Sequence, residues 1–325
     1  MRITHIPMKK LYILTLMLVS LKMLGQQDPQ YTQYMYNMAV LNPAYAGSKE
    51  TISTGILYRD QWSGISGAPV TKTFFGHSPV GNNVGLGLSV IADEIGPVQE
   101  TNSYVDFSYT VKLGGQHNLA FGMKAGATFH NIGLTGLEGI SPNDPLFSED
   151  INKVSPNLGG GIFYYTNKFY FSASVPNMIE TYFIQDGDDE YQFGSQRMHL
   201  FVTSGYVFNL SDGIKFKPSF LLKLISPLNP EAQAPYDKLR LSVPKSYDLN
   251  ANFLFYDVLE LGVSERNAES WSGLVNFAIT PNLRIGYAYD SVTSNIKQFA
   301  PASHEFILLF DLDLGRRVSR SPRFF

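Results

Sequence analysis

The chain has 325 residues, of which 16% are charged and 14% are aromatic, and its formal net charge is -3. The charged fraction is below the roughly 25% typical of soluble proteins, and the slightly acidic balance argues against nucleic-acid binding, which needs a basic face. The sequence contains no cysteine, which excludes disulfides and an acylated lipoprotein anchor.

Residues 1–25 predict a signal peptide. Three basic residues precede an apolar run at 11–24, and cleavage near Gly25 would leave Gln26 or Gln27 as the first mature residue. The alternative is a retained anchor helix, but the run is short for a membrane span, which needs roughly 20 apolar residues. We therefore expect an exported protein.

Residues 26–50 form a distinct N-terminal segment that is rich in Tyr, Gln, Asn and Met and lacks a strand period. We expect it to lie in the periplasm or to enter the lumen of the domain that follows. The segment ends in the run Asn42-Pro43-Ala44-Tyr45-Ala46-Gly47, in which Asn-Pro favours a turn and Gly47 permits a positive φ.

Residues 51–314 predict an all-β domain, an antiparallel transmembrane β-barrel. Apolar side chains occupy every second position, and strand side chains alternate between two faces, so each strand has one apolar and one polar surface. We expect about 14 strands, with 12–16 as the range, because single-chain bacterial barrels have an even number. The predicted strands are 51–58, 70–78, 84–92, 101–113, 118–130, 157–165, 168–175, 197–209, 214–225, 246–256, 257–264, 270–279, 282–290 and 303–314.

Two strands illustrate the expected faces. The odd residues of 119–129 should face lipid, with Lys124 and His130 inside, and the odd residues of 247–255 should face lipid, with Asp248 inside. A soluble β-sandwich or a lipocalin-like barrel alternates in the same way, with the apolar face as its core. Chain length, strand number, the export signal and the aromatic content favour the membrane barrel.

The predicted connections are of two kinds. Turns such as Thr280-Pro281 are very short, whereas 131–156, 176–196 and 226–245 are long and polar or rich in proline. In outer-membrane barrels the short turns face the periplasm and the long loops face outside. A basic tail, residues 315–325, follows the last predicted strand.

No catalytic or cofactor chemistry is predicted. The six histidines have no metal-ligand spacing, and the neighbours His304 and Glu305 should point to opposite faces of a strand. The acidic run 186–190 has oxygen ligands for calcium, but it lacks the EF-hand spacing and is better interpreted as a solvated loop. We therefore expect no enzyme, no cofactor and no metal site.

Several blocks of the sequence together resemble the PorP/SprF family, outer-membrane proteins of the type IX secretion system in the Bacteroidetes. The blocks span the mature chain in order: Gln27 to Tyr34, Asn42 to Gly47, Tyr58-Arg59-Asp60-Gln61-Trp62, Gly67-Ala68-Pro69, Ile95-Gly96-Pro97, Gly286 to Asp290, Thr293-Ser294 and Ser303-His304-Glu305.

The resemblance implies a non-enzymatic barrel of the outer membrane that works in protein export. One branch of the family is a core component associated with the periplasmic ring, and the other is a dedicated partner of one large secreted surface protein, such as a gliding adhesin. We expect the second role, in which the barrel receives, exports or anchors the C-terminal domain of that protein. The expected partners are therefore that exported protein, further type IX secretion components and outer-membrane lipid, with no nucleic acid.

The positions chosen as candidates for partner contact are Asn42, Pro43, Tyr45, Gly47, Arg59 and Trp62. The first four should set the turn into the first strand, Arg59 should pair in the lumen or with a loop, and Trp62 suits a membrane interface. Two other interpretations remain open at this point, a channel for small solutes and an outer-membrane enzyme.

Overall fold

The structure is a computed structural model that describes residues 30–49, 51–136, 149–179, 181–186, 189–196, 198–225, 246–267 and 269–312. The predicted signal peptide and the predicted basic tail lie outside the described residues. Within those residues, no helix is long and apolar enough to cross a membrane.

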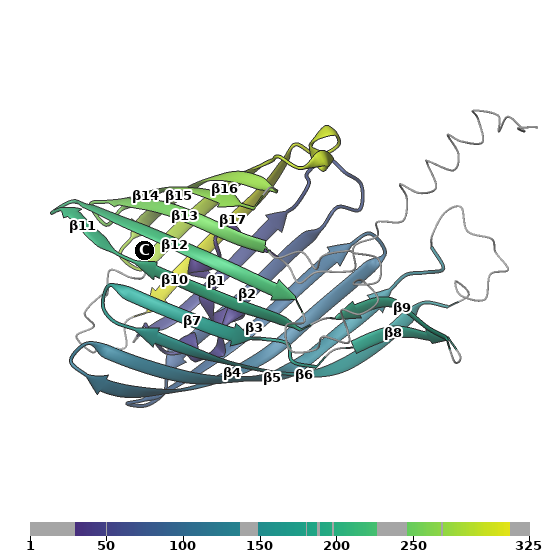
Figure 1. Cartoon of the computed structure of the whole chain (residues 1–325), viewed down its shortest axis with the longest axis horizontal. Coiled ribbons are helices and arrows are strands. Elements are labelled where there is room, and N and C mark those ends of the chain that lie inside the picture. Colours follow the sequence, from purple (N-terminus) through teal and green to yellow (C-terminus); the bar gives the residue numbers. More distant parts are fainter. Residues whose placement is uncertain are drawn as a thin grey trace, which may run out of the picture.

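Antiparallel strands close into a barrel (Figure 1). The strands of the wall are β1 (Ile52–Asp60), β2 (Val70–Pro79), β3 (Val84–Ile95), β4 (Val98–Gly114), β5 (His117–Ile132), β6 (Ile151–Tyr165), β7 (Phe169–Val175), β10 (His199–Tyr206), β11 (Phe208–Ser211), β12 (Ile214–Ile225), β13 (Ser246–Phe255), β14 (Leu259–Arg266), β15 (Ser270–Thr280), β16 (Leu283–Val292) and β17 (Ala302–Leu312). A separate hairpin consists of β8 (Thr181–Asp186) and β9 (Asp189–Gln196).

The sheet closes because its first and last strands pair. β1 pairs with β17 along its whole length, from Ile52 opposite Leu312 to Asp60 opposite His304. β10 and β11 follow each other along the chain on either side of Val207, and both pair with β12, so they act as one wall strand. Counted over the described residues, the barrel wall therefore has 14 strands, as the sequence predicts.

Most predicted strands match the observed ones closely, with two corrections in the loops. The stretch 176–196, which the sequence analysis treats as a loop, contains the hairpin β8–β9, which Figure 1 shows beyond the rim of the barrel. The long stretch 131–156 is shorter than expected, because β5 runs to Ile132 and β6 begins at Ile151. The acidic run 186–190 falls on the turn of the β8–β9 hairpin, with Gly187 and Asp188 outside the described residues.

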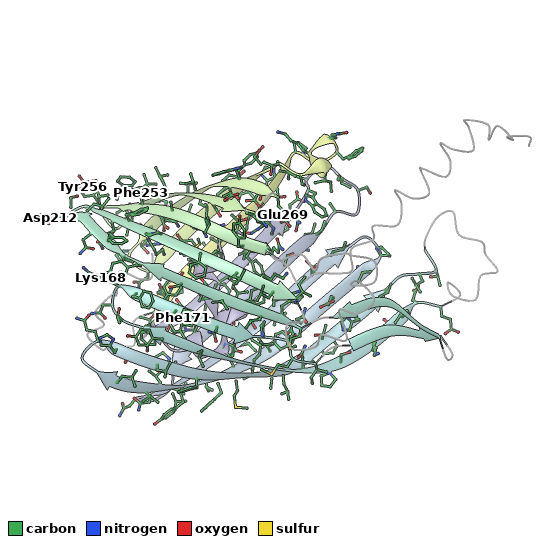
Figure 2. All side chains as sticks on the ribbon, viewed as in Figure 1. Lys168, Phe171, Asp212, Phe253, Tyr256 and Glu269 are labelled. Atoms are coloured by element: carbon green, nitrogen blue, oxygen red, sulfur yellow. The ribbon has the colours of Figure 1, made fainter. Side chains whose placement is uncertain are left out.

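The two rims of the barrel differ, as predicted. One rim, here called the short-turn rim, carries only turns of four residues or fewer, such as the β11–β12 and β15–β16 connections. The opposite rim, the long-loop rim, carries the β1–β2, β5–β6, β7–β10 and β12–β13 connections. In Figure 2, Lys168, Asp212 and Tyr256 mark the short-turn rim, and Glu269 lies toward the other end.

The two faces of the wall also follow the prediction. On β5 the side chains of Phe121, Met123 and Phe129 are exposed on the outside, whereas Lys124 and His130 are buried inside. On β13 the side chain of Leu249 is exposed, and those of Asp248, Asn250 and Asn252 are buried. An apolar exterior around a polar interior is the arrangement of a barrel surrounded by lipid.

The lumen is filled by the chain itself. Residues 30–49, here called the lumen segment, contain three short helical turns, η1 (Tyr34–Tyr36), α2 (Met38–Leu41) and η2 (Pro43–Tyr45). Nearly every side chain of residues 31–46 is buried, and these side chains share one core cluster with inward-facing residues of the wall such as Leu57 and Phe163. Of the two locations expected for the N-terminal segment, the periplasm and the lumen, the structure shows the lumen.

Candidate functional site: the segment held in the barrel lumen

The first contact zone is a buried charge cluster near the long-loop rim. Arg59 on β1 forms ion pairs of 2.8 Å with Asp290 on β16 and 2.9 Å with Glu305 on β17. The side chains of all three residues are at most 3% exposed. A buried charge is tolerated only when it is paired and hydrogen-bonded, and here each carboxylate contacts the same guanidinium.

The lumen segment completes this cluster. The backbone N–H groups of Thr32 and Gln33 donate to the two carboxylate oxygens of Glu305, at 2.9 and 2.8 Å. The Thr32 hydroxyl lies 2.9 Å from both carboxylate oxygens of Asp290, and it accepts a hydrogen bond from Arg59 at 3.0 Å. Glu305 thus neutralises Arg59 and binds the backbone of the segment at the same time. Removing either partner would leave a buried charge unpaired.

A second charged pair holds the segment beside the first cluster. Arg266, the last residue of β14, forms a two-pronged contact with Asp248 on β13, with its Nη2 at 2.8 Å and its Nε at 3.0 Å from the carboxylate oxygens. The same Nη2 donates to the carbonyl oxygen of Tyr31 at 3.2 Å. The Tyr31 hydroxyl lies 3.0 Å from the hydroxyl of Thr73 on β2. The segment is therefore bonded to several sides of the wall.

The middle of the lumen segment binds the wall through tyrosines. The Tyr34 hydroxyl donates to Ser219 at 3.3 Å and accepts from Asn250 at 3.0 Å. The Tyr36 hydroxyl accepts from Asn276 at 3.1 Å, and the ammonium of Lys217 lies 5.7 Å from the centre of the Tyr36 ring, within cation–π range. The inward-facing Asn and Lys residues of the wall thus contact the segment.

The turn formed by residues 42–47 fits against the wall near the short-turn rim. The Asn42 Oδ1 accepts from the Ala44 N–H at 2.9 Å, and its Nδ2 donates to Ile162 and Ser172 at 2.8 and 2.7 Å. Gly47 adopts a φ of +73°, as predicted from the sequence. The turn closes the segment before β1 begins.

Three wall glycines make room for this turn. A Cβ on Gly122 would lie 2.0 Å from the Ala44 nitrogen, one on Gly161 would lie 2.2 Å from the Asn42 Oδ1, and one on Gly85 would lie 2.2 Å from the Ala46 carbonyl oxygen. Real Cβ atoms do not come this close to their neighbours, so the wall lacks side chains where the turn needs the space. The turn is therefore held against the wall by complementary shape as well as by hydrogen bonds.

The structure divides the six predicted site residues into three groups. Asn42, Pro43, Tyr45 and Gly47 belong to the turn in the lumen, and Arg59 lies in the charge cluster. Trp62 lies apart from both, in the β1–β2 loop of the long-loop rim, where it is half-buried with a φ of +56°. Its N–H donates to the Ser303 hydroxyl at 3.0 Å. A partner contact for any of the six stays a prediction.

Sequence reasoning missed Asp290, Glu305 and Thr32 as one site. Each lies in a block that carries the family resemblance, as does Arg59, and folding brings these blocks together. The blocks around Gly67 and Gly96 also meet, since the Gly96 N–H donates to the Gly67 carbonyl at 2.9 Å. The available signal was one charged residue on the polar face of each of the three strands β1, β16 and β17. The order of the strands around the barrel was needed to recognise that these residues pair.

The arrangement has no feature of a catalytic or metal centre. Within the part of the chain that the structure describes, no group of three or more metal-ligand side chains could hold an ion. His304 and Glu305 point to opposite faces, as expected, because Glu305 enters the cluster and the His304 ring bonds the Tyr287 hydroxyl at 2.8 Å. The charged side chains of the cluster pair with one another and hold the segment.

Comparison with solved structures identifies the fold. The chain is similar to the CymD monoaromatic hydrocarbon channel at 9% identity, over 86% of this chain and 93% of that one, with a TM-score of 0.50. It is also similar to Omp33 of Acinetobacter baumannii (10% identity, 80% and 96% covered, TM-score 0.44) and to the toluene transporter TbuX of Ralstonia pickettii (11%, 84% and 92%, 0.48). At such identities the likeness concerns the outer-membrane barrel fold alone.

Comparison of the sequence identifies the family. A search of curated proteins found no match to the chain. Residues 23–310 match the family described as type IX secretion system membrane protein PorP/SprF, and the match covers the lumen segment and nearly the whole barrel. The chain therefore belongs to the PorP/SprF family of type IX secretion system membrane proteins.

Proposed function

We propose that this barrel is a protein-binding accessory of type IX secretion, whose long-loop rim receives the C-terminal domain of a large secreted surface protein and helps to export or anchor it. The observation that carries the proposal is the filled lumen: residues 30–49 occupy the space through which a channel would conduct. The protein is a non-enzymatic membrane component of the secretion system, so its work consists of contacts with other proteins.

The contacts of the lumen segment argue against a channel for small solutes. The segment is bonded to the wall by charges near one rim, by tyrosine hydroxyls in the middle and by a fitted turn near the other rim. Opening a continuous path would break buried ion pairs and hydrogen bonds, each of which costs free energy when its partner is left unpaired. A barrel whose lumen segment is held in place is better suited to support its loops rigidly than to conduct solutes.

The long-loop rim offers the surface for a partner. In outer-membrane barrels this rim faces outside, where an exported protein has to be held. Two of the loops have hydrogen bonds among their described residues: the Trp62 N–H donates to the Ser303 hydroxyl, and the Asp150 carboxylate accepts from the backbone N–H and the hydroxyl of Thr135 at 3.0 and 2.8 Å. The N–H donated by Thr135 lowers the pKa of Asp150, because the hydrogen bond favours the ionised carboxylate. Loop residues that are already held by such bonds lose less conformational entropy when they bind a partner.

The test is a pull-down of the tagged protein from its native envelope in mild detergent, followed by mass spectrometry. Recovery of one large exported protein through its C-terminal domain supports the proposal. Recovery of ring and peptidoglycan-binding components instead would replace it with a role in the core apparatus.

Conductance in planar bilayers provides the second test. A closed barrel gives little current. Steady large conductance from the purified protein would contradict the proposal and favour a solute channel.

A further inference from the structure

The wall of the barrel closes at one seam, where the first strand, β1, pairs with the last, β17. Residues that meet across this seam lie far apart in the chain: Arg59 is directly opposite Glu305, 246 positions away, and Ser53 is directly opposite Asp311, 258 positions away. The other pairs of neighbouring wall strands are close along the chain, with the β8–β9 hairpin inserted between β7 and β10. Bringing distant residues together costs more chain entropy than closing a short turn, so the seam is the pairing that most needs additional contacts.

At the long-loop end of the seam, the lumen segment bonds both sides. On the β1 side, Arg59 donates to the Thr32 hydroxyl at 3.0 Å. On the β17 side, the Glu305 carboxylate accepts from the backbone N–H groups of Thr32 and Gln33 at 2.9 and 2.8 Å, and the Glu305 carbonyl oxygen accepts from the Gln33 side chain at 3.4 Å. Because Arg59 and Glu305 are an opposed pair across the seam, the segment is bonded to the pair that joins the two strands.

At the short-turn end of the seam, the later part of the segment makes a second set of contacts. The Lys49 ammonium lies 3.4 Å from the carboxylate of Asp311 on β17, and that carboxylate also accepts from the hydroxyl of Ser53 on β1 at 2.6 Å. The Gly47 N–H donates at 3.2 Å to His77 on β2, which lies opposite Ser53 in register. The segment therefore runs along the seam from the long-loop rim to the short-turn rim, and it contacts a polar cross-strand pair at each end.

Between these two polar pairs the inner face of the seam is apolar. Leu57 on β1 lies opposite Ile307, and at the next inward position Gly55 lies opposite Leu309. The three larger side chains are buried in the same core cluster as the lumen segment. In a barrel without the segment they would face the water of the lumen, and removal of apolar surface from water is the dominant favourable term in packing. The order of polar, apolar and polar positions along the seam therefore matches the order of contacts along the segment.

We propose that the lumen segment is an internal clamp that closes the barrel by holding β17 against β1. The segment leads directly into β1, so once it lies against the inner face of that strand it presents two backbone N–H donors and an ammonium group to the carboxylates of β17. The clamp acts in the assembly and stability of the wall, and it does not depend on whether the rim binds an exported protein.

The clamp predicts that weakening both ends of the segment loosens the seam in particular. Thr32→Val removes the hydroxyl that bonds Arg59 and Asp290, which lie on the two sides of the seam. Lys49→Met removes the ammonium at the other end, and the two changes together are called the clamp variant. Asn42→Ala is the matched control, since it removes hydrogen bonds of the same segment to β6 and β7, away from the seam.

Two disulfide locks show where the wall is loosened, because the natural chain has no cysteine. The seam lock joins Ile56→Cys with Leu308→Cys, at positions that are directly opposite across the seam and exposed on the outside. The remote lock joins Val105→Cys with Ala125→Cys, at exposed positions that are directly opposite on β4 and β5. Opposed strand residues have Cα atoms about 4.5–5.5 Å apart, which suits a disulfide. Each variant is compared with the same lock alone, so the effect of the lock itself cancels.

The measured quantity is the temperature at which the folded band disappears on a heat-modifiable gel. We expect the clamp variant to lower this temperature without a lock and with the remote lock, and we expect the seam lock to remove more than half of the loss. The loss caused by Asn42→Ala should be the same in all three backgrounds. If the unlocked clamp variant gives no folded band at all, the seam lock should restore the band and the remote lock should not.

Three results would overturn the clamp: no loss in the unlocked clamp variant, equal effects of the two locks on the clamp variant, or an equal rescue of Asn42→Ala by the seam lock. The last result would mean that the seam lock compensates for any weakening of the segment. None of these results bears on the pull-down, so the clamp and the proposed function can fail separately.

Discussion

A methyl group added at Gly122 should unseat the turn of residues 42–46 from the wall. The Cβ of an alanine would lie 2.0 Å from the Ala44 nitrogen and 2.4 Å from the Pro43 carbonyl carbon. Both neighbours are backbone atoms, so no side chain can rotate away to relieve the overlap. Gly273 is the matched control, since it lies in a wall strand and a Cβ there has nothing within 4 Å.

The size of the effect follows from the contacts that the turn would lose. Contacts under 3.0 Å force a shift, so the turn has to move by about 1 Å. Such a shift takes the Asn42 bonds to Ile162 and Ser172, at 2.8 and 2.7 Å, and the Ser108 bond to the Ala46 carbonyl, at 2.6 Å, beyond hydrogen-bonding range. The loss of three hydrogen bonds at about 1 kcal/mol each lowers the free energy of seating the segment by about 3 kcal/mol. The equilibrium between seated and unseated segment then shifts by about a hundred-fold.

Two measurements check Gly122→Ala. The temperature at which the folded band disappears on a heat-modifiable gel should fall relative to wild type and to Gly273→Ala, and bilayer recordings should show openings that both of these lack. Wild-type stability together with wild-type closure in Gly122→Ala would refute the fit between the turn and the wall.

Three further changes probe the charge cluster, the rim and the lipid face. Arg59→Leu leaves Asp290 and Glu305 buried without the guanidinium that contacts both, and it should cost about 3–5 kcal/mol of stability. A gel melting temperature equal to that of wild type would contradict a buried cluster, and Arg59→Lys should restore part of the loss. Trp62→Ala should reduce the exported protein recovered in pull-downs while the folded band persists; loss of that band would make Trp62 a structural residue only. Met123→Lys changes a side chain that is 68% exposed on the outside of β5, and it should lower the free energy of unfolding in lipid bilayers by about 2–4 kcal/mol. An unchanged free energy of unfolding in urea would mean that this face does not contact lipid.

The sequence by itself determined the barrel and its faces. Alternation of apolar and polar residues needs no knowledge of neighbouring strands, because side-chain direction along a strand is a local property. The alternation on β5 and β13, the long and short connections and the positive φ of Gly47 could therefore be predicted. The hairpin β8–β9 was missed because its residues carry no clear alternation.

The role of the polar inner face, which binds the lumen segment, could be recognised only in the tertiary structure. Thr32, Arg59, Asp290 and Glu305 are up to 273 positions apart in the chain, and their meeting depends on barrel closure, which places β1 beside β17. The space for the turn at Gly122 likewise depends on how the lumen segment lies against a wall strand far along the chain. Local patterns set which way a side chain points, whereas closure of the sheet sets what it meets, so the filled lumen and the direction of the segment through it were visible only in the folded protein.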